Sequence, residues 1–132
     1  MNKNQLLQKY NLKSTPQRLE IIDLLLKNGH CSIDSLYHSL KIKFPSISLS
    51  TIYKNINTMR DKCFLSEVKI SGQKNAYELI KDEHSHVVCI KCHQILDIQV
   101  NVSELLNQAK EASHYKLNES SVVFHGICSK CE

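Results

Sequence analysis

Hydrophobic residues recur every three or four positions through the first half of the chain, which is the spacing of amphipathic helices. A weak pattern covers Gln5–Tyr10, and a stronger one runs from Thr15 to Gly29. Thr15 suits the N-cap and Pro16 the first helical position of the second helix. We expect its core-facing residues to be Leu19, Ile22, Leu25 and Leu26.

Two further helices are predicted to begin at Ser32 and Ser48. The third helix ends before Pro45, because a proline disfavours helix in the residue that precedes it. The fourth runs to about Asp61 and has an apolar stripe within an arc of roughly 80°, so this face must pack on a core. The expected core residues are Ile33, Leu36, Tyr37 and Leu40 in the third helix and Leu49, Ile52, Ile56 and Met59 in the fourth.

Alternating apolar and polar residues then replace the helical pattern. Leu65–Ile70 and Ala76–Ile80, joined by a polar Gly-containing turn, predict a β-hairpin. Helices followed by a hairpin are the order of a winged helix. We therefore predict an α+β fold with a winged-helix DNA-binding domain at residues 1–80, a charged hinge at 81–83 and a second domain at 84–132.

The second domain is predicted to be a small α/β unit that dimerises. Three strands are expected at Val87–Ile90, Ile95–Val100 and Val122–Ile127. So few strands leave a sheet edge and an apolar face uncovered, and self-association covers both. Between the second and third strands lies a predicted helix, Ser103–Ser113, with Leu105, Leu106 and Ala109 facing inward.

Charge is divided unevenly along the 132 residues. Residues 1–80 carry twelve Lys or Arg and six Asp or Glu, a balance of +6, and residues 81–132 carry five and seven, a balance of −2; together they give the net +4. This division favours a polyanion-binding domain joined to a sensor domain, although small basic domains are common. No long apolar run is present, so we expect neither a signal peptide nor a membrane span, and a cytoplasmic protein.

The outer face of the fourth helix has the chemistry for DNA. It combines hydrogen-bonding and cationic groups with few acids, as a helix in the major groove requires, although an ordinary solvated face is the alternative. Lysines of the hairpin are placed to meet phosphate. The predicted contacts on the two elements are Ser50, Thr51, Tyr53, Lys54, Asn57, Lys69 and Lys74.

Two Cys-x-x-Cys pairs, Cys89 with Cys92 and Cys128 with Cys131, predict a structural zinc site of four thiolates. The alternative is a disulfide or a redox motif. A redox motif, however, needs a single pair at a helix start, whereas here two pairs adjoin predicted strands. Cys31 and Cys63 are isolated, and we expect each to be a small buried hydrophobic residue.

A second metal site is predicted beside the first pair. His84 and His86 point to the same face if their segment is a strand, and a tight turn brings Asp97 back toward them. Glu78 and His30 are further candidates. Such a mixed nitrogen and oxygen site suits Fe(II) or Mn(II), and would also bind Zn(II). The alternative is that these are exposed strand residues. We expect His38, His93, His114 and His125 to be surface or core residues.

These motifs resemble those of the Fur-type bacterial metalloregulators. The resemblance rests on 15–18 (TPQR), on 50–55 (STIYKN), on His-x-His-x-x-Cys-x-x-Cys at 84–92 and on the C-terminal Cys-x-x-Cys. It implies a homodimeric repressor that binds an inverted-repeat operator when metal-loaded, with zinc on the cysteines, and it places Arg18 among the DNA-binding residues. It also implies a regulatory site made of His30, Glu78, His84, His86 and Asp97.

Within this family the chain looks most like the peroxide-sensing PerR group. Asp97 follows the first cysteine pair, where iron-sensing members usually carry Glu, whereas Glu78 stands where PerR proteins commonly have Asp. In place of the Gly that usually follows this pair the chain has His93. The alternatives are an iron-responsive or zinc-responsive regulator and, from another class, a zinc or iron enzyme or a thiol oxidoreductase. The enzyme alternatives lack a positioned nucleophile or base and do not explain the basic half, so we expect no enzyme.

Overall fold

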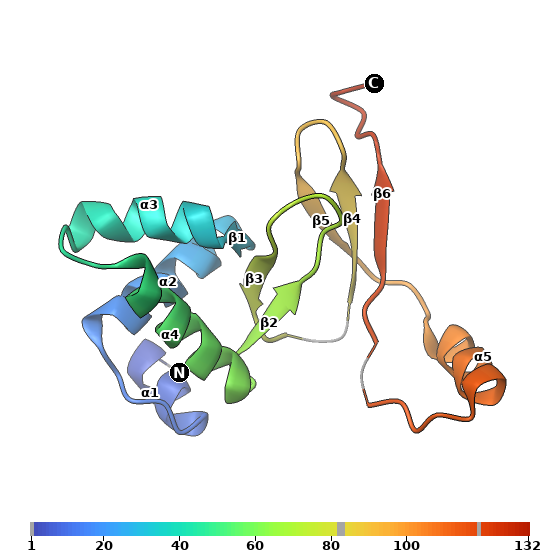
Figure 1. The fold of residues 1–132 in the computed structure, drawn as a ribbon, viewed down its shortest axis with the longest axis horizontal. Helices are drawn as coiled ribbons and strands as arrows, with labels where there is room; N and C mark the ends of the chain where they lie inside the picture. The colour runs from blue at the N-terminus through green and yellow to red at the C-terminus, as the bar shows by residue number, and fades with distance from the viewer. Residues whose placement is uncertain (1, 82–83, 119) are drawn as a thin grey trace. The chain divides into compact units, whose positions relative to one another are not determined.

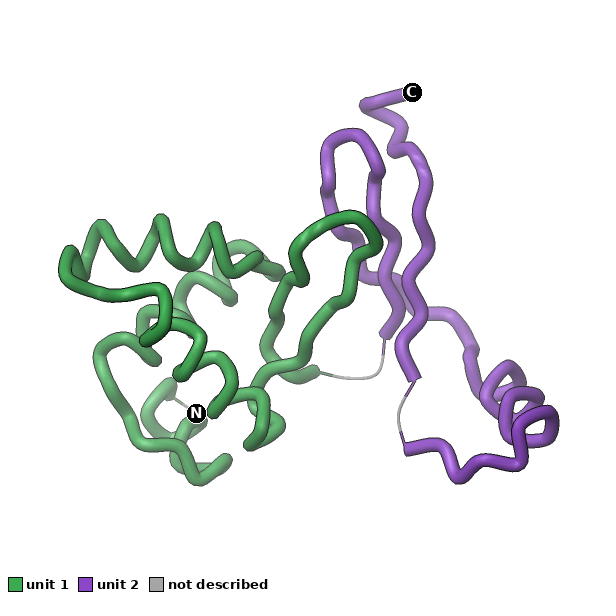
Figure 2. Tube along the Cα trace, in the orientation of Figure 1, with its two compact units in different colours: residues 1–81 green, residues 82–132 purple. Residues whose placement is uncertain are grey.

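The chain divides into two compact units, residues 1–81 and 82–132 (Figure 2). The computed structural model describes residues 2–81, 84–118 and 120–132. The predicted hinge at 81–83 therefore includes two residues that lie outside the described ones. We describe each unit by itself.

Unit 1 is built from four helices and a three-stranded sheet (Figure 1). Thr15, Ser32 and Ser48 cap α2, α3 and α4 by accepting a hydrogen bond from the backbone N–H three residues on. Asn2 caps α1 in the same way, and α1 begins two residues before the predicted start at Gln5. The helices are α1 (Lys3–Lys9), α2 (Pro16–Asn28), α3 (Ile33–Lys43) and α4 (Leu49–Asp61).

The sheet of unit 1 has the order β1-β3-β2 and contains the predicted hairpin. Its strands are β1 (Cys31–Ser32), β2 (Leu65–Val68) and β3 (Ala76–Leu79), and both pairings are antiparallel. The sequence did not predict β1, because a strand of two residues shows no alternation. In the hairpin, Gly72 adopts a φ of +76°, which a residue without a side chain accommodates most easily.

The helices of unit 1 enclose one hydrophobic core, and the predicted stripes supply most of it. Ile22, Leu36 and Ile56 are fully buried, one from each of three helices. Two expected core residues are wrong: Leu26 is 65% exposed and Leu49 is 41% exposed. Each lies in a terminal turn of its helix, where periodicity continues after the covering elements have ended.

Cys31 and Cys63 differ, although both were expected to be buried. Cys31 is buried, whereas Cys63 is exposed. Cys63 follows α4 in a left-handed conformation with φ 61°. Its N–H donates to the Arg60 carbonyl, and the next N–H, of Phe64, donates to the Met59 carbonyl, both at 2.9 Å. This is the hydrogen-bond pattern of a Schellman helix end, which directs the side chain to solvent.

Unit 2 is a three-stranded sheet with one helix, α5 (Ser103–Ser113). The central strand pairs antiparallel with β5 and parallel with β6, and the order is β5-β4-β6. The strands are β4 (Ser85–Cys89), β5 (Ile95–Ile98) and β6 (Val123–Gly126), each within two residues of its predicted start.

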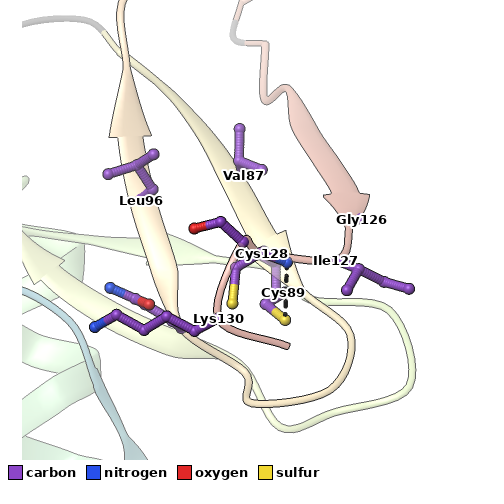
Figure 3. Close-up of a pocket in the computed structure, with 10 residues that line it drawn as sticks. Val87, Cys89, Leu96, Gly126, Ile127, Cys128 and Lys130 are labelled. Atoms are coloured by element: carbon purple, nitrogen blue, oxygen red, sulfur yellow. Dashed lines mark hydrogen bonds between the residues drawn. The ribbon is translucent and has the colours of Figure 1, made fainter. Parts of the chain in front are cut away.

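The expectation that α5 packs inward is wrong. No residue of α5 is buried, and Leu105 is 57% exposed. The sheet likewise has uncovered apolar residues, and Val87 and Leu96 line an open cavity of about 440 Å³ beside the cysteines (Figure 3). Within the described part of unit 2, only Ser85, His86, Val88 and Cys89 are buried, so this unit has a thin core. None of the described helices is both long and apolar enough to cross a membrane.

Candidate metal centres

The four cysteines of the two Cys-x-x-Cys motifs gather at one end of the sheet in unit 2. Cys89 ends β4, and Cys128 lies two residues after β6 (Figure 3). Their sulfurs, with those of Cys92 and Cys131, all lie within 4.8 Å of one another, and Cys92 and Cys128 are 3.8 Å apart. Four sulfurs at about 2.3 Å from a tetrahedral zinc ion are separated by about 3.8 Å, so the donor set fits structural zinc.

The backbone around the cysteines favours thiolate. The N–H groups of Cys128 and Cys92 point at the Cys89 sulfur from 3.4 and 3.5 Å. These donors lower the pKa of Cys89 to about 5, and the N–H of Cys128 has the larger effect. Hydrogen bonds with Cys128 and Cys92 instead raise the pKa of Cys131 to about 12. One sulfur is therefore ready to bind a cation, and the cluster holds protons that metal binding would displace.

The turn after the first cysteine pair depends on His93. Its φ is 65°, in the left-handed region. The His93 N–H donates to the Cys89 carbonyl at 2.9 Å, and the Cys89 N–H donates to the Gln94 carbonyl at 3.0 Å. The turn that brings Cys92 back toward Cys89 is thus made by a residue other than glycine in the left-handed conformation.

Unit 1 holds two of the five predicted regulatory ligands, and they lie together. His30 Nε2 is 2.7 Å from Glu78 Oε2. Glu78, on β3, is 2% exposed, and its other oxygen accepts a hydrogen bond from the Ser66 hydroxyl at 3.2 Å. Lys81 Nζ also approaches Glu78 Oε2, at 3.6 Å. A buried carboxylate needs such positive or donating partners.

Unit 2 holds the other three ligands, which also lie together. Asp97 on β5 stands directly opposite His86 on β4 in the ladder. Asp97 Oδ1 is 3.5 Å from His86 Nε2 and 3.8 Å from His84 Nε2. The two imidazole rings are 4.5 Å apart between centroids. Asp97 reaches the histidines because the two strands pair at this register, and the intervening turn is the one that carries Cys92.

The donor atoms in both groups have the separation of ligands around a single ion. Neighbouring ligands at about 2.1 Å from a metal are about 3 Å apart. The Nε2 to oxygen distances of 2.7 and 3.5 Å fit this geometry. Imidazole and carboxylate donors suit Fe(II), Mn(II) or Zn(II). Sequence reasoning missed Ser66 and Lys81 as partners of Glu78, because these contacts depend on strand register and on the path of the chain after β3, which no residue pattern encodes.

Four of the five predicted DNA-binding side chains of α4 lie on its solvent side, whereas Thr51 is half-buried. Ser50, Tyr53, Lys54 and Asn57 are exposed, as are Lys69 and Lys74 in the hairpin. Arg18 is engaged within the protein: its Nε donates to Asn55 Oδ1 at 3.1 Å and its Nη1 to the Lys13 carbonyl at 2.9 Å. Lys74 forms an ion pair with Asp34 at 3.0 Å, and this hydrogen bond raises the pKa of Lys74.

Comparison with known proteins shows which family the chain belongs to. The sequence pattern of the ferric uptake regulator family matches residues 9–112. The chain belongs to this family. The Fur-family chain is 27% identical over 128 residues to the peroxide-responsive repressor PerR of Staphylococcus epidermidis, covering 96% of this chain and 85% of that one.

Solved structures of the family share the fold of this Fur-family chain. The Campylobacter jejuni peroxide stress regulator is 36% identical and covers 99% of this chain and 100% of its own, with a TM-score of 0.70. The Helicobacter pylori ferric uptake regulator, described as having three functional metal binding sites, is 25% identical and covers 97% of this chain and 87% of its own, with a TM-score of 0.75.

Proposed function

We propose that this chain is a homodimeric, metal-dependent repressor that binds an inverted-repeat operator in the cytoplasm and releases it when peroxide oxidises its metal-binding histidines. The observation that supports this proposal is that the five predicted ligands form two compact groups, one within each unit. Unit 1 presents His30 and Glu78, 2.7 Å apart, and unit 2 presents His84, His86 and Asp97 around a shared carboxylate oxygen.

One ion held by both groups couples metal binding to DNA binding. Unit 1 carries α4, and unit 2 carries the uncovered apolar residues that a second copy would cover. Ligands from both units fix the hinge between them, and in a dimer the hinge sets the separation of the two α4 helices. Half-sites lie a whole number of helical turns apart, so a wrong separation prevents simultaneous binding. Each 1.4 kcal/mol of this coupling changes operator affinity about tenfold.

The same ligands make the switch sensitive to peroxide. Fe(II) held by these residues would supply the electron that cleaves the peroxide O–O bond, so that one oxygen is added to an imidazole carbon and the other leaves as water; Mn(II) would not supply that electron. His30 and His84 are the imidazoles that we expect to take up an oxygen atom. An oxidised imidazole donates more weakly, so the ligand set loses one member and the hinge is released.

Relatives in both branches bear on the sensing function. The Staphylococcus epidermidis and Campylobacter jejuni proteins are named for the response to peroxide, and their identity to this chain is 27% and 36%. Asp97 after the first cysteine pair also favours the peroxide branch. The second candidate is an iron-responsive regulator, favoured by Glu78 and by the likeness to the Helicobacter pylori protein.

The deciding experiment compares two metals. Protein whose cysteines are zinc-loaded is charged anaerobically with Fe(II) or Mn(II), operator binding is measured, and dilute peroxide is added. A peroxide sensor loses operator binding only in the Fe(II) form. Its peptide that contains His30 or His84 also gains about 16 Da, the mass of one oxygen atom. His114 and His125, outside the ligand set, serve as internal controls. Indifference to peroxide with continued dependence on Fe(II) would support the iron-responsive regulator instead.

A further inference from the structure

Glu67 is bonded on both of its carboxylate oxygens at the base of the hairpin. Arg60 Nη1 donates to Glu67 Oε2 at 3.0 Å, and Asn75 Nδ2 donates to Glu67 Oε1 at 2.6 Å. The Glu67 side chain is only 18% exposed, less than half the value of 39% for Arg60. A carboxylate so shielded and so fully bonded has one preferred orientation, unlike a surface ion pair that exchanges freely with water.

Glu67 and its two hydrogen-bond partners come from three different segments of unit 1. Arg60 is in the last turn of α4, Glu67 is on β2, and Asn75 immediately precedes β3. Tyr77 stands opposite Glu67 in the strand ladder and is 6% exposed. Burial, followed by the negative charge of Glu67, raises the pKa of Tyr77, which keeps its hydroxyl protonated and able to donate.

This arrangement ties the helix that carries the predicted base contacts to the hairpin that carries the predicted phosphate contacts. Lys69 and Lys74 lie in the loop between β2 and β3, whose two ends are held by Glu67 and Asn75. The same end of the loop is held a second time, through the ion pair of Lys74 with Asp34 on α3. In Figure 1 the hairpin leaves directly from the end of α4, so small rotations at its base would move its tip.

We propose that Glu67 is a positioning residue for DNA recognition, an inference that rests on the repressor function proposed above. Glu67 touches no DNA itself. It fixes the hairpin at one angle to α4, so that the hairpin lysines reach phosphates while α4 occupies the groove. Phosphate contacts set the register in which a recognition helix reads bases, and a loose hairpin therefore lowers specificity as well as affinity.

The proposal makes a prediction opposite in sign to that of simple electrostatics. Glu67→Gln removes one negative charge near a polyanion-binding surface, which by charge alone strengthens binding to any DNA. A positioning role requires weaker binding to the specific site. Asp61→Asn is the matched control, since Asp61 is an exposed acid at the end of the same helix and its loss changes the net charge equally.

The probe is a duplex obtained by selection from a random library with the Mn(II)-loaded wild-type protein. Dissociation constants for this duplex and for a scrambled one are measured at several salt concentrations for wild type, Glu67→Gln and Asp61→Asn, below the melting temperature of each. For Glu67→Gln we expect the ratio of specific to scrambled affinity to fall at least about tenfold and the salt slope to fall by about 1–2, the loss of one or two phosphate contacts. For Asp61→Asn we expect both affinities to rise by the same factor.

Asn75→Ala provides a second variant for the case in which Glu67→Gln does not fold. It removes one hydrogen bond to Glu67 and leaves the net charge unchanged, and we expect the same changes at smaller size. The positioning role is overturned if the ratio of specific to scrambled affinity and the salt slope change in Glu67→Gln in the same way as in Asp61→Asn. It is also overturned if neither quantity changes in Asn75→Ala. A wild-type protein that selects no sequence overturns the repressor function, and the inference with it.

Discussion

The backbone conformation of Cys63 is strained, because the residue has a side chain. It ends α4 with φ 61°, a conformation in which any side chain contacts the following carbonyl. We expect Cys63→Gly to raise the free energy of unfolding by about 0.5–1 kcal/mol, because relief of about 1–2 kcal/mol is partly offset by the greater freedom of glycine in the unfolded chain. Denaturant unfolding of the zinc-loaded protein measures the change. Cys63→Ala retains the Cβ and should give no gain, so equal stability of the two variants would argue against strain here.

The thiols of Cys31 and Cys63, which lie outside the cysteine cluster, should differ sharply in reactivity. Burial raises the pKa of Cys31, an effect that its hydrogen bond from Asn28 only partly opposes. A raised pKa leaves less thiolate at pH 8, and the thiolate is the nucleophile. In zinc-loaded protein we expect iodoacetamide to alkylate exposed Cys63 well before Cys31, and raising the pH should speed the reaction of Cys31. Peptide mass spectrometry follows both sites, and equal rates would mean that Cys31 is accessible.

At the scale of elements, sequence and structure agree where local chemistry decides the outcome. Thr15, Ser32 and Ser48 were predictable as caps, because a hydroxyl just before an amphipathic helix can accept a hydrogen bond from a free N–H of the first turn. The four cysteines were likewise predictable, since their spacing admits few alternatives. The inward packing of α5 was not predictable, because periodicity identifies an apolar stripe and says nothing about what covers it. The bond from Ser66 to Glu78 and the network around Glu67 depend on strand register, which the sequence left open.

The cap of α4 provides a test at this scale. Ser48 Oγ accepts a hydrogen bond from the Thr51 N–H at 3.2 Å. We expect Ser48→Ala to lower the free energy of unfolding by about 1 kcal/mol, the usual cost of removing such a cap. Thermal or denaturant unfolding measures it. Ser39→Ala, the same substitution in the middle of α3, should alter stability by less than about 0.5 kcal/mol; equal losses would show that the cap has no special part in stabilising α4.

At the scale of the whole molecule, the two units differ in what stabilises them. Unit 1 has a core supplied by all four helices, whereas the described part of unit 2 buries only four residues, one of which is Cys89 of the cysteine cluster. We expect zinc removal by a chelator to unfold unit 2 and leave unit 1 folded, because metal binding supplies the stability that burial does not. Hydrogen exchange read by peptide should then rise in β4, β5 and β6 while α2–α4 stay protected. Equal loss of protection in both units would mean that they fold as one.

The proposal that two units share one regulatory ion has a test in stoichiometry. Glu78 and Asp97 lie on different units, and each contacts a histidine of its own unit. If one ion joins both groups, titration of the zinc-loaded protein with Mn(II) gives one binding event per protomer, and Glu78→Gln and Asp97→Asn each weaken that same event by at least about tenfold. His125→Ala, outside both groups, should leave it unchanged. Separate ions would instead give two events, with each variant removing one and sparing the other. That result would uncouple the hinge from the metal, because an ion held within one unit has no differential affinity for the two hinge positions and cannot shift the balance between them.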